Sequence, residues 1–320
     1  MAQRVNMTAR VNQYCFILAF LMFLQINTAP AAEKSLKVFI LAGQSNMQGH
    51  GVVPANPQRN EGKGSLEYAA SHSRNKEIKN WLQADGTWVT RDDVWIHYME
   101  RHGKLSPTFG VREDCIGPEL GFGAVVGDHF GEPVLLIKLA WGGKSLAKDF
   151  RPPSAPGGET GEYYTALLDG IRKVLGEFTQ IFPELEGRSP EVIGFGWHQG
   201  WNDRVNQAHN DAYQQNMTHF IHDLRKDLGK PELPIVIAET GMSGYEEKHP
   251  RAVSLMAAQA AVAKQPEFVG NVAFVETKPF YRPADQSPSG QAYHWNTNGE
   301  TYYLIGEGMG KAMLGLIGNP

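Results

Sequence analysis

Ser45 is the first residue of the chain whose type and surroundings suggest covalent chemistry. It follows the apolar, strand-like run 38–42 and a glycine, and the amide side chains of Gln44 and Asn46 flank it. A serine placed directly after a buried strand, where the chain turns, is a common position for a nucleophile in α/β enzymes. An ordinary polar turn has the same local pattern, so the partners of Ser45 must be sought further along the chain.

His294 is the candidate base for this serine. A serine hydroxyl is a poor nucleophile near neutral pH and needs an adjacent base, for which histidine is the usual choice. His294 lies in a short polar and aromatic loop just before the last helical pattern of the chain. The order of nucleophile first and base last would let the two meet across the top of a sheet. The alternative is a surface histidine, since the chain has 11 histidines.

Acyl transfer also needs hydrogen-bond donors aimed at the developing oxyanion. The backbone N–H of Ser45 is one candidate. A glycine of the pair 142–143 can bring a second N–H close to the substrate, because it has no β-carbon. The uncharged amide of Gln199 is a third candidate. A plain tight turn and a buried turn amide are the structural alternatives for the last two features.

The elements that must position these residues alternate between short apolar runs and helical patterns. The predicted strands cover residues 36–41, 94–98, 134–139, 192–197, 235–238 and 272–275. The predicted helices cover residues 163–178, 212–228, 251–264 and 299–316. This alternation predicts a central parallel sheet between two layers of helices, with the ligand site beyond the carboxyl ends of the strands.

Four polar or glycine-rich segments follow predicted strands or precede the last helix, and we expect them to converge at one edge of the sheet. They are residues 43–46, 140–145, 197–203 and 293–296. Residues 49–116 carry scattered aromatic, charged and turn residues, and are interpreted as a long insertion in a single domain that covers residues 32–320. Long insertions at the active face commonly form the walls of a binding site.

The N-terminal residues have the pattern of a secretory signal peptide. Arg4 and Arg10 precede the apolar run 14–24, and small residues follow at 29–31. The apolar run has about eleven residues and is too short to span a bilayer. We therefore expect a signal peptide over residues 1–31, cleavage after Ala31, no membrane span after cleavage, and an exported protein, either periplasmic or secreted. The mature chain would keep Cys115 as its single cysteine and would have no intrachain disulfide.

Composition argues against several other classes of function. The chain has a net charge of −4 and no long basic run, so nucleic acid is not an expected partner. His219 and His222 lie three residues apart in a helical pattern, but no third and fourth ligand accompany them. We therefore expect neither a metal nor a cofactor, and a metal-dependent hydrolase is the weakest of the alternatives.

Taken together, the segments resemble the SGNH-hydrolase superfamily, and most of all its sialate O-acetylesterase-like branch, the carbohydrate esterases of the family-six type. The matching pieces are residues 43–47 (Gly-Gln-Ser-Asn-Met), 141–143 (Trp-Gly-Gly), 197–200 (Trp-His-Gln-Gly) and His294. The resemblance covers residues 36–316. It implies a flavodoxin-like three-layer α/β/α fold and metal-independent deacetylation of sugars. By the same match Ser45 is the nucleophile, His294 is the base, and Gly143 and Gln199 supply oxyanion donors.

The chain departs from the pattern of this family at two positions. The family usually has an aspartate three residues before its histidine, where this chain has Gln291, and many relatives have a glutamate where it has Trp201. The group that orients the histidine is therefore open. Asp203 is the first candidate, and Asp285 and Glu276 are the others. A serine–histidine pair oriented by backbone or water is also compatible with the sequence.

The leading hypothesis is an exported carbohydrate O-acetylesterase that acts on an acetylated carbohydrate through a Ser-His mechanism and an acyl-enzyme intermediate. The alternative is a carbohydrate-binding protein on an SGNH scaffold with weak or lost catalysis, because the usual aspartate is replaced by Gln291.

Overall fold

The computed structural model describes Met1 and residues 34–318. The predicted signal peptide and its cleavage position lie outside these residues. In the described part, a seven-stranded sheet has the strand order β4-β3-β6-β1-β7-β8-β9, and every neighbouring pair is parallel except β3 and β4. The strands are β1 (Lys34–Gly43), β3 (Val94–Tyr98), β4 (Arg101–Lys104), β6 (Val134–Ala140), β7 (Arg188–His198), β8 (Ile235–Ala238) and β9 (Val272–Val275), and β2 (Gly51–Val52) pairs with β5 (Cys115–Ile116) in a second sheet.

The central strand β1 is buried on both faces. Successive side chains of a strand point to opposite faces of the sheet. Val38 and Ile40 accordingly belong to one hydrophobic core, whereas Phe39 and Leu41 belong to the other. All four side chains are fully buried, which explains why this strand is a continuous apolar run in the sequence.

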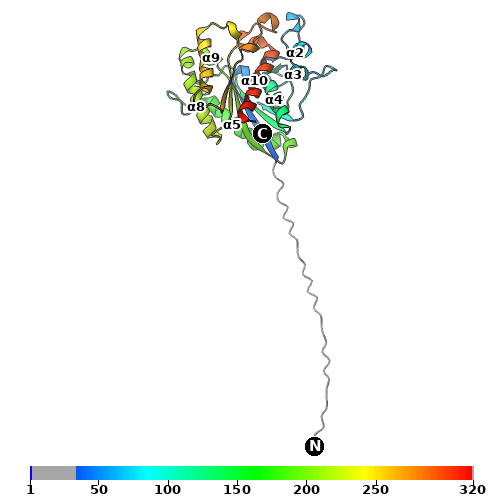
Figure 1. The fold of residues 1–320 in the computed structure, drawn as a ribbon, viewed down its shortest axis with the longest axis vertical. Coiled ribbons are helices and arrows are strands. Elements are labelled where there is room, and N and C mark those ends of the chain that lie inside the picture. The colour runs from blue at the N-terminus through cyan, green and yellow to red at the C-terminus, as the bar shows by residue number, and fades with distance from the viewer. Residues whose placement is uncertain (2–33, 319–320) are drawn as a thin grey trace. The chain divides into compact units, whose positions relative to one another are not determined.

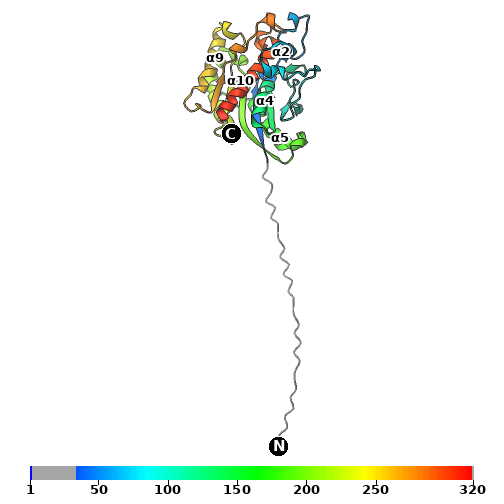
Figure 2. The ribbon, with the colours of Figure 1, turned by 45° about the vertical axis from the view of Figure 1, so that its right-hand side comes forward.

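Helices cover both faces of the sheet (Figures 1 and 2). On one face, Leu167, Phe220 and Leu255 pack into the core that contains Val38. On the other face, Leu120 pairs with residues such as Met309 in the second core. The helices of the first face are α5 (Glu162–Ile181), α8 (Tyr213–Asp227) and α9 (Pro250–Ala263), and those of the second are α4 (Glu119–Phe130) and α10 (Gly299–Ile317). The predicted three-layer α/β/α fold is confirmed.

Residues 49–116 are more closely built into the fold than a peripheral insertion would be. Strand β3 pairs with β6, and β4 extends the same sheet at its edge. Strand β3 has buried apolar side chains on both faces, because Val94 and Ile96 belong to one hydrophobic core and Trp95 belongs to the other. The rest of the segment forms the strands β2 and β5, the 3₁₀ helix η1 (Asn60–Gly62), the helices α2 (Leu66–His72) and α3 (Lys76–Lys79), and connecting turns.

The topology places a crevice at the carboxyl end of β1. After β1 the chain forms β3, β4 and β6 on one side of that strand, and it then crosses to β7 on the other side. Ligands of open α/β sheets bind at such a switch point. Three short helices lie at this edge, namely α1 (Ser45–Gln48), α6 (Trp201–Arg204) and the 3₁₀ segment η6 (Ala292–Thr297). Within residues 34–318, no helix combines the length and apolarity needed to cross a membrane.

Candidate active site

Ser45 lies at the point where β1 ends and α1 begins. The turn is tight: a β-carbon on Gly43 would lie 2.2 Å from the carbonyl oxygen of His198, so only glycine fits between the two strands. The N–H groups of Met47 and Gln48 then bond back to the carbonyl of Gln44 at 2.8 and 2.9 Å. Ser45 is half-buried as the first residue of this turn of helix.

Gln44 ties the loop that follows β7 to the Ser45 turn. Its side chain is buried, and its Oε1 accepts hydrogen bonds from the N–H groups of Gly200 (3.1 Å) and Asn202 (3.2 Å). Buried backbone donors need such partners. The Gln44 side chain therefore fixes the position of the 199–203 loop relative to Ser45.

Asn46 joins the Ser45 turn to the loop that carries His294. Its Nδ2 donates to the carbonyl of Tyr293 at 3.1 Å, and its Oδ1 accepts from the Tyr302 hydroxyl at 2.7 Å. The residue after Ser45 is thus bonded to the residue before His294, so the structure brings the two predicted catalytic residues to the same edge of the sheet. Among the described residues no hydrogen bond joins Ser45 to His294 directly. Catalytic hydrogen bonds are often long in ligand-free enzymes.

His294 stacks on a second histidine that the sequence analysis did not single out. The rings of His50 and His294 are nearly parallel, at an angle of 11° and a centroid distance of 3.7 Å. Burial lowers the pKa of each ring from 6.5 to about 4. The positive charges of Arg112 and Lys138 act in the same direction on the pKa of His50. Both rings are therefore neutral near pH 7, the state in which His294 can accept a proton.

The chain directly after His294 has an unusual backbone. Trp295, Asn296 and Thr297 all have φ values between 52° and 54°, in the left-handed region that costs a non-glycine residue roughly 1–2 kcal/mol. Two contacts hold this conformation. The Trp295 side chain is fully buried, and Asn296 Nδ2 donates to the carbonyl of Arg282 at 3.0 Å. Strained backbone of this kind is concentrated at functional sites.

The structure does not place Asp203 on His294, and this corrects the expectation that Asp203 orients the histidine. The Asp203 carboxylate accepts hydrogen bonds from the N–H groups of Leu146 and Ala147, both at 2.8 Å, and from Gln199 Nε2 at 2.6 Å. Burial raises its pKa to about 6, against the opposing effect of these donors. Asp203 therefore holds the 144–147 loop against the 199–203 loop.

Among residues 34–318, no other carboxylate bonds His294 in place of Asp203. Within the described residues, Nδ1 of His294 is buried without a hydrogen-bond partner. Glu276 pairs with Lys278 at 3.3 Å, and the Asp285 side chain is exposed to solvent. Gln291, at the position where the family has aspartate, is exposed as well. The histidine is thus held by its stack on His50 and by its own loop.

The geometry also changes the assignment of the oxyanion donors. Gln199 is buried, and its Nε2, which has two hydrogens, already faces three acceptors: Gln44 Oε1, the Lys144 carbonyl and Asp203 Oδ2. It has no hydrogen left for a substrate. Asn202 is better placed, because its Nδ2 lies on the exposed Gly142–Gly143 turn and bonds the Gly143 carbonyl at 2.5 Å.

The Gly142–Gly143 turn itself lies beside Ser45, as expected. A β-carbon on Gly142 would lie 3.8 Å from the β-carbon of Ser45 and 2.9 Å from Gln48 Oε1. Gly143 has a φ of 71°, a conformation that favours glycine. The turn therefore presents backbone rather than side chain to the space above Ser45.

A buried ion pair under α1 was also not predicted from the sequence. Lys138 lies in the apolar strand β6, and its Nζ contacts Glu119 Oε2 at 2.7 Å with both side chains fully buried. The same ammonium donates to the carbonyls of Gln48 (2.7 Å) and Phe109 (2.8 Å). It therefore anchors the C-terminal end of the Ser45 turn. The signal was present, because a lysine within an apolar strand must find a buried partner.

The described residues contain no group of three or more histidine, cysteine or acidic side chains that could hold a metal ion. His219 and His222 have separate partners: the first bonds Ser154 Oγ at 2.8 Å, and the second lies 3.2 Å from Glu267 Oε2.

Comparison with solved structures gives the class of the fold. The chain superposes on the X-ray structure of a protein from Arabidopsis thaliana with a TM-score of 0.58 and 17% identity, covering 88% of this chain and 98% of that one. A carbohydrate acetylesterase from Xanthomonas citri gives a TM-score of 0.50 and 13% identity, covering 87% of this chain and 55% of that one. Both likenesses show that the chain shares its three-layer α/β/α fold with these proteins.

The family follows from the sequence. Residues 35–315 match the family described as carbohydrate esterase, sialic acid-specific acetylesterase. A curated relative, a probable carbohydrate esterase of Arabidopsis thaliana, is 26% identical over 217 residues, which are 66% of this chain and 72% of the relative. The chain belongs to this carbohydrate esterase family, and the resemblance inferred from the motifs is confirmed.

Proposed function

We propose that the protein is an exported carbohydrate O-acetylesterase in which Ser45 and His294 carry the reaction. The observation that supports this most is the hydrogen bond from Asn46 to Tyr293, because it holds the loop of His294 beside the turn of Ser45. A neutral, half-buried histidine next to a serine at the end of a central strand is the arrangement that nucleophilic acyl transfer requires.

In the first half of the reaction, His294 removes the proton of the Ser45 hydroxyl as its oxygen attacks the acetyl carbonyl. The carbonyl oxygen becomes an oxyanion, stabilised by the N–H groups of Ser45 and Gly143 and by the Asn202 amide. The bond to the sugar oxygen then breaks, and the protonated His294 gives its proton to that oxygen. An acetyl group remains on Ser45.

In the second half, His294 accepts a proton from a water molecule, which attacks the acetyl-enzyme. The oxyanion forms again at the same donors. Collapse of this intermediate releases acetate and returns the proton to Ser45. The His50 ring would hold the plane of His294 through both halves, which is one of the tasks that a carboxylate has in the usual triad.

Hydrolysis of a chromogenic aryl acetate by the purified protein tests this proposal. We expect turnover by the wild type, loss of turnover in Ser45→Ala and His294→Ala, and labelling of Ser45 by a serine-directed phosphonate. A wild type that turns over neither aryl acetates nor acetylated polysaccharides, and that the phosphonate leaves unlabelled, would refute the esterase proposal.

The proposal of export depends on the order of basic, apolar and small residues at the N-terminus. N-terminal sequencing of the protein from its native host tests it. A mature chain that begins at Ala32 supports export, and an intact N-terminus on a protein recovered from the cytoplasm contradicts it.

A further inference from the structure

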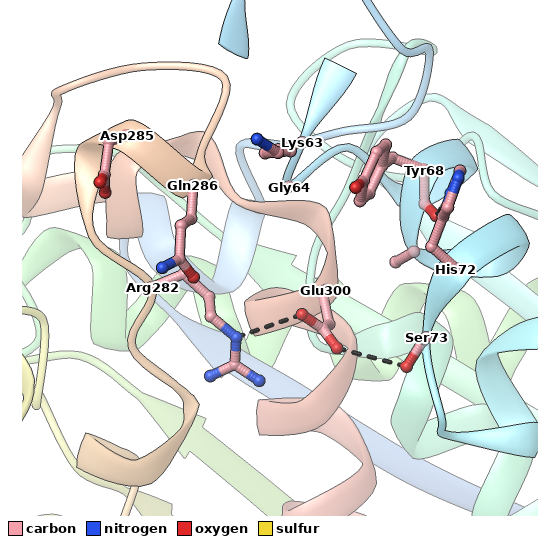
Figure 3. A pocket seen from close by; sticks show the side chains of 10 residues that line it. Lys63, Gly64, Tyr68, His72, Ser73, Arg282, Asp285, Gln286 and Glu300 are labelled. Carbon is pink, nitrogen blue, oxygen red and sulfur yellow. Dashed lines mark hydrogen bonds and ion pairs between the residues drawn. The ribbon is translucent and has the colours of Figure 1, made fainter. Parts of the chain in front are cut away.

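A cavity of about 500 Å³ lies between α2 and the segment 282–286, whose backbone is bonded to the loop of His294 through Asn296. It is bounded by Lys63, Tyr68 and His72 on one part of its wall and by Arg282, Gln286 and Glu300 on the other (Figure 3). Neither Ser45 nor His294 lines it. The volume lies within the range of about 300–1,000 Å³ that is usual for small-molecule sites.

One wall of this cavity is a pair of stacked rings. Tyr68 and His72, one helical turn apart on α2, have a centroid distance of 4.1 Å and an interplanar angle of 13°. His72 Nδ1 lies 3.0 Å from the carbonyl of Tyr68, which fixes the second ring against the first. Such a rigid, partly exposed aromatic surface combines an apolar face with a polar tip, and it suits the apolar C–H face of a sugar ring.

The opposite wall is polar and held in place by hydrogen bonds. Arg282 Nε bonds Glu300 Oε2 at 3.2 Å, and its Nη1 donates to the carbonyl of Tyr281 at 3.1 Å. Ser73 Oγ lies 3.4 Å from the other oxygen of Glu300. The guanidinium and the carboxylate are therefore arranged before any ligand arrives, which reduces the entropic cost of binding.

The charges of the cavity balance. Lys63 and Arg282 are cationic, Asp285 and Glu300 are anionic, and Gln286 adds a neutral amide. Both cations are already paired, Lys63 with Glu61 at 2.7 Å and Arg282 with Glu300 at 3.2 Å. A sugar hydroxyl, which is both donor and acceptor, fits such a wall, whereas an anionic sugar would compete with the carboxylates that already occupy the two cations.

The cavity is joined to the loop of His294 by two buried amides. Asn296, two residues after His294, donates to the carbonyl of Arg282 at 3.0 Å. Asn298 Nδ2 donates to the carbonyl of Gln286 at 3.1 Å. The backbone that carries Arg282 and Gln286 is therefore bonded to the loop that carries the proposed base, His294.

From these observations we propose that the cavity is a subsite for a neutral sugar residue of the substrate chain, stacked on Tyr68 and hydrogen-bonded by Arg282, Gln286 and Asp285. This inference rests on the proposed carbohydrate function. It extends that function by naming a second binding position for the polysaccharide, away from the acetyl group, and by specifying that the sugar bound there is uncharged.

Binding to the Ser45→Ala protein tests the subsite independently of catalysis. Isothermal titration would use neutral tetrasaccharides (cello-, xylo-, manno- and laminaritetraose) and one acidic oligosaccharide, tetragalacturonic acid. We expect at least one neutral tetrasaccharide to bind, Tyr68→Ala to weaken its affinity about tenfold through loss of the ring, and Ser71→Ala, on the same helix but outside the cavity, to leave it unchanged. Binding by none of the neutral probes, preference for the acidic one, or equal affinity in Tyr68→Ala would overturn the proposal.

A kinetic experiment separates failure of the subsite from failure of the proposed reaction. Tyr68→Ala should keep the wild-type kcat/KM on a small aryl acetate, which does not reach the cavity, and should raise KM on an acetylated form of the tetrasaccharide that binds. Equal loss on both substrates would mean that Tyr68 acts only through the fold and would overturn the subsite. An inactive wild type with intact tetrasaccharide binding would refute the esterase reaction alone.

Discussion

The rings of His50 and His294 lie face to face at 3.7 Å, in a site where no carboxylate of the described residues bonds the buried Nδ1 of His294. A carboxylate partner normally fixes the plane and tautomer of a catalytic histidine. Here the stack can fix the plane, but no group of the described residues bonds Nδ1 to fix the tautomer. The sequence suggested lost catalysis because Gln291 replaces the usual aspartate. In the structure, the His50 ring supports the histidine instead.

The first prediction compares two substitutions of His50. His50→Phe keeps a flat ring against His294, and we expect a kcat close to that of the wild type. His50→Ala removes the support, and a misplaced base should reduce kcat about 10²-fold. Steady-state kinetics on an aryl acetate would measure both. Equal rates for His50→Ala and the wild type would show that the stack does not position the base.

The second prediction concerns the pH dependence of kcat/KM. The pKa of His294 is lowered by burial to about 4, so the ring stays unprotonated as the pH falls from 8 toward 5. We expect kcat/KM to remain level over this range and to decline through about pH 4, where the stacked pair takes up protons with apparent pKa values that belong to both rings. A decline centred near pH 6.5 would mean that His294 is exposed to water in the free enzyme. In His50→Ala the decline should move toward that value, because the ring becomes more exposed.

Much of the fold could be predicted from the sequence, because it depends on local patterns. The runs 94–98, 235–238 and 272–275 are strands with those bounds, since buried parallel strands are continuous apolar segments. The segment 49–116 was harder to interpret. Its strand β3 joins the main sheet through pairing with β6, a contact between residues far apart in the chain that no local pattern encodes.

The site was predictable at the level of segments and not of individual contacts. All four polar segments lie at strand ends or before the last helix, as their positions predicted. The hydrogen-bond partners of Asp203 could not be predicted from its position near Gln199 in the sequence. A buried carboxylate accepts hydrogen bonds from whichever backbone donors the fold brings to it, here the N–H groups of Leu146 and Ala147. Likewise, only the folded loops place His50 on His294.

The third prediction tests Asn202 as an oxyanion donor. Asn202→Ala removes an amide that faces the turn above Ser45, and we expect kcat to fall about 10²–10³-fold, as for the loss of one oxyanion donor. KM should change little. Asn202→Asp is the matched variant, because it keeps the shape but replaces the donor with a negative charge, and it should be at least as slow. An Asn202→Ala enzyme with a wild-type kcat would remove this residue from the reaction.

The fourth prediction is that Asp203 acts on stability rather than on His294. Asp203→Asn replaces one acceptor oxygen by an amino group facing N–H donors, and the free energy of unfolding should fall by about 1–3 kcal/mol. An acid that orients the base would instead cost about 10⁴ in kcat with little change in folding. Urea denaturation and kcat measured on the same preparation separate the two cases. A stable Asp203→Asn protein with a rate reduced to that extent would restore Asp203 as the orienting acid.

The fifth prediction is a loss of stability on acidification, to which His198 contributes. This fully buried ring has its pKa lowered by burial to about 3, against 6.5 for the ordinary side chain. Between these values the unfolded chain binds a proton that the native state does not, so the free energy of unfolding falls as pH decreases below 6.5. Above pH 6.5 the neutral His198 does not reduce stability. Between pH 6.5 and 5, the proton bound by the unfolded chain lowers the free energy of unfolding by about 2 kcal/mol.

His198→Phe is the variant that isolates this contribution, since it keeps a buried aromatic ring and cannot take up a proton. Asp203 acts in the opposite sense, because its raised pKa of about 6 makes the native state bind a proton first, but it does so equally in both proteins. Urea denaturation at pH 8.0, 6.5 and 5.0 should therefore give a shallower decline for His198→Phe than for the wild type. Parallel declines would mean that the His198 side chain is accessible to protons in the native state.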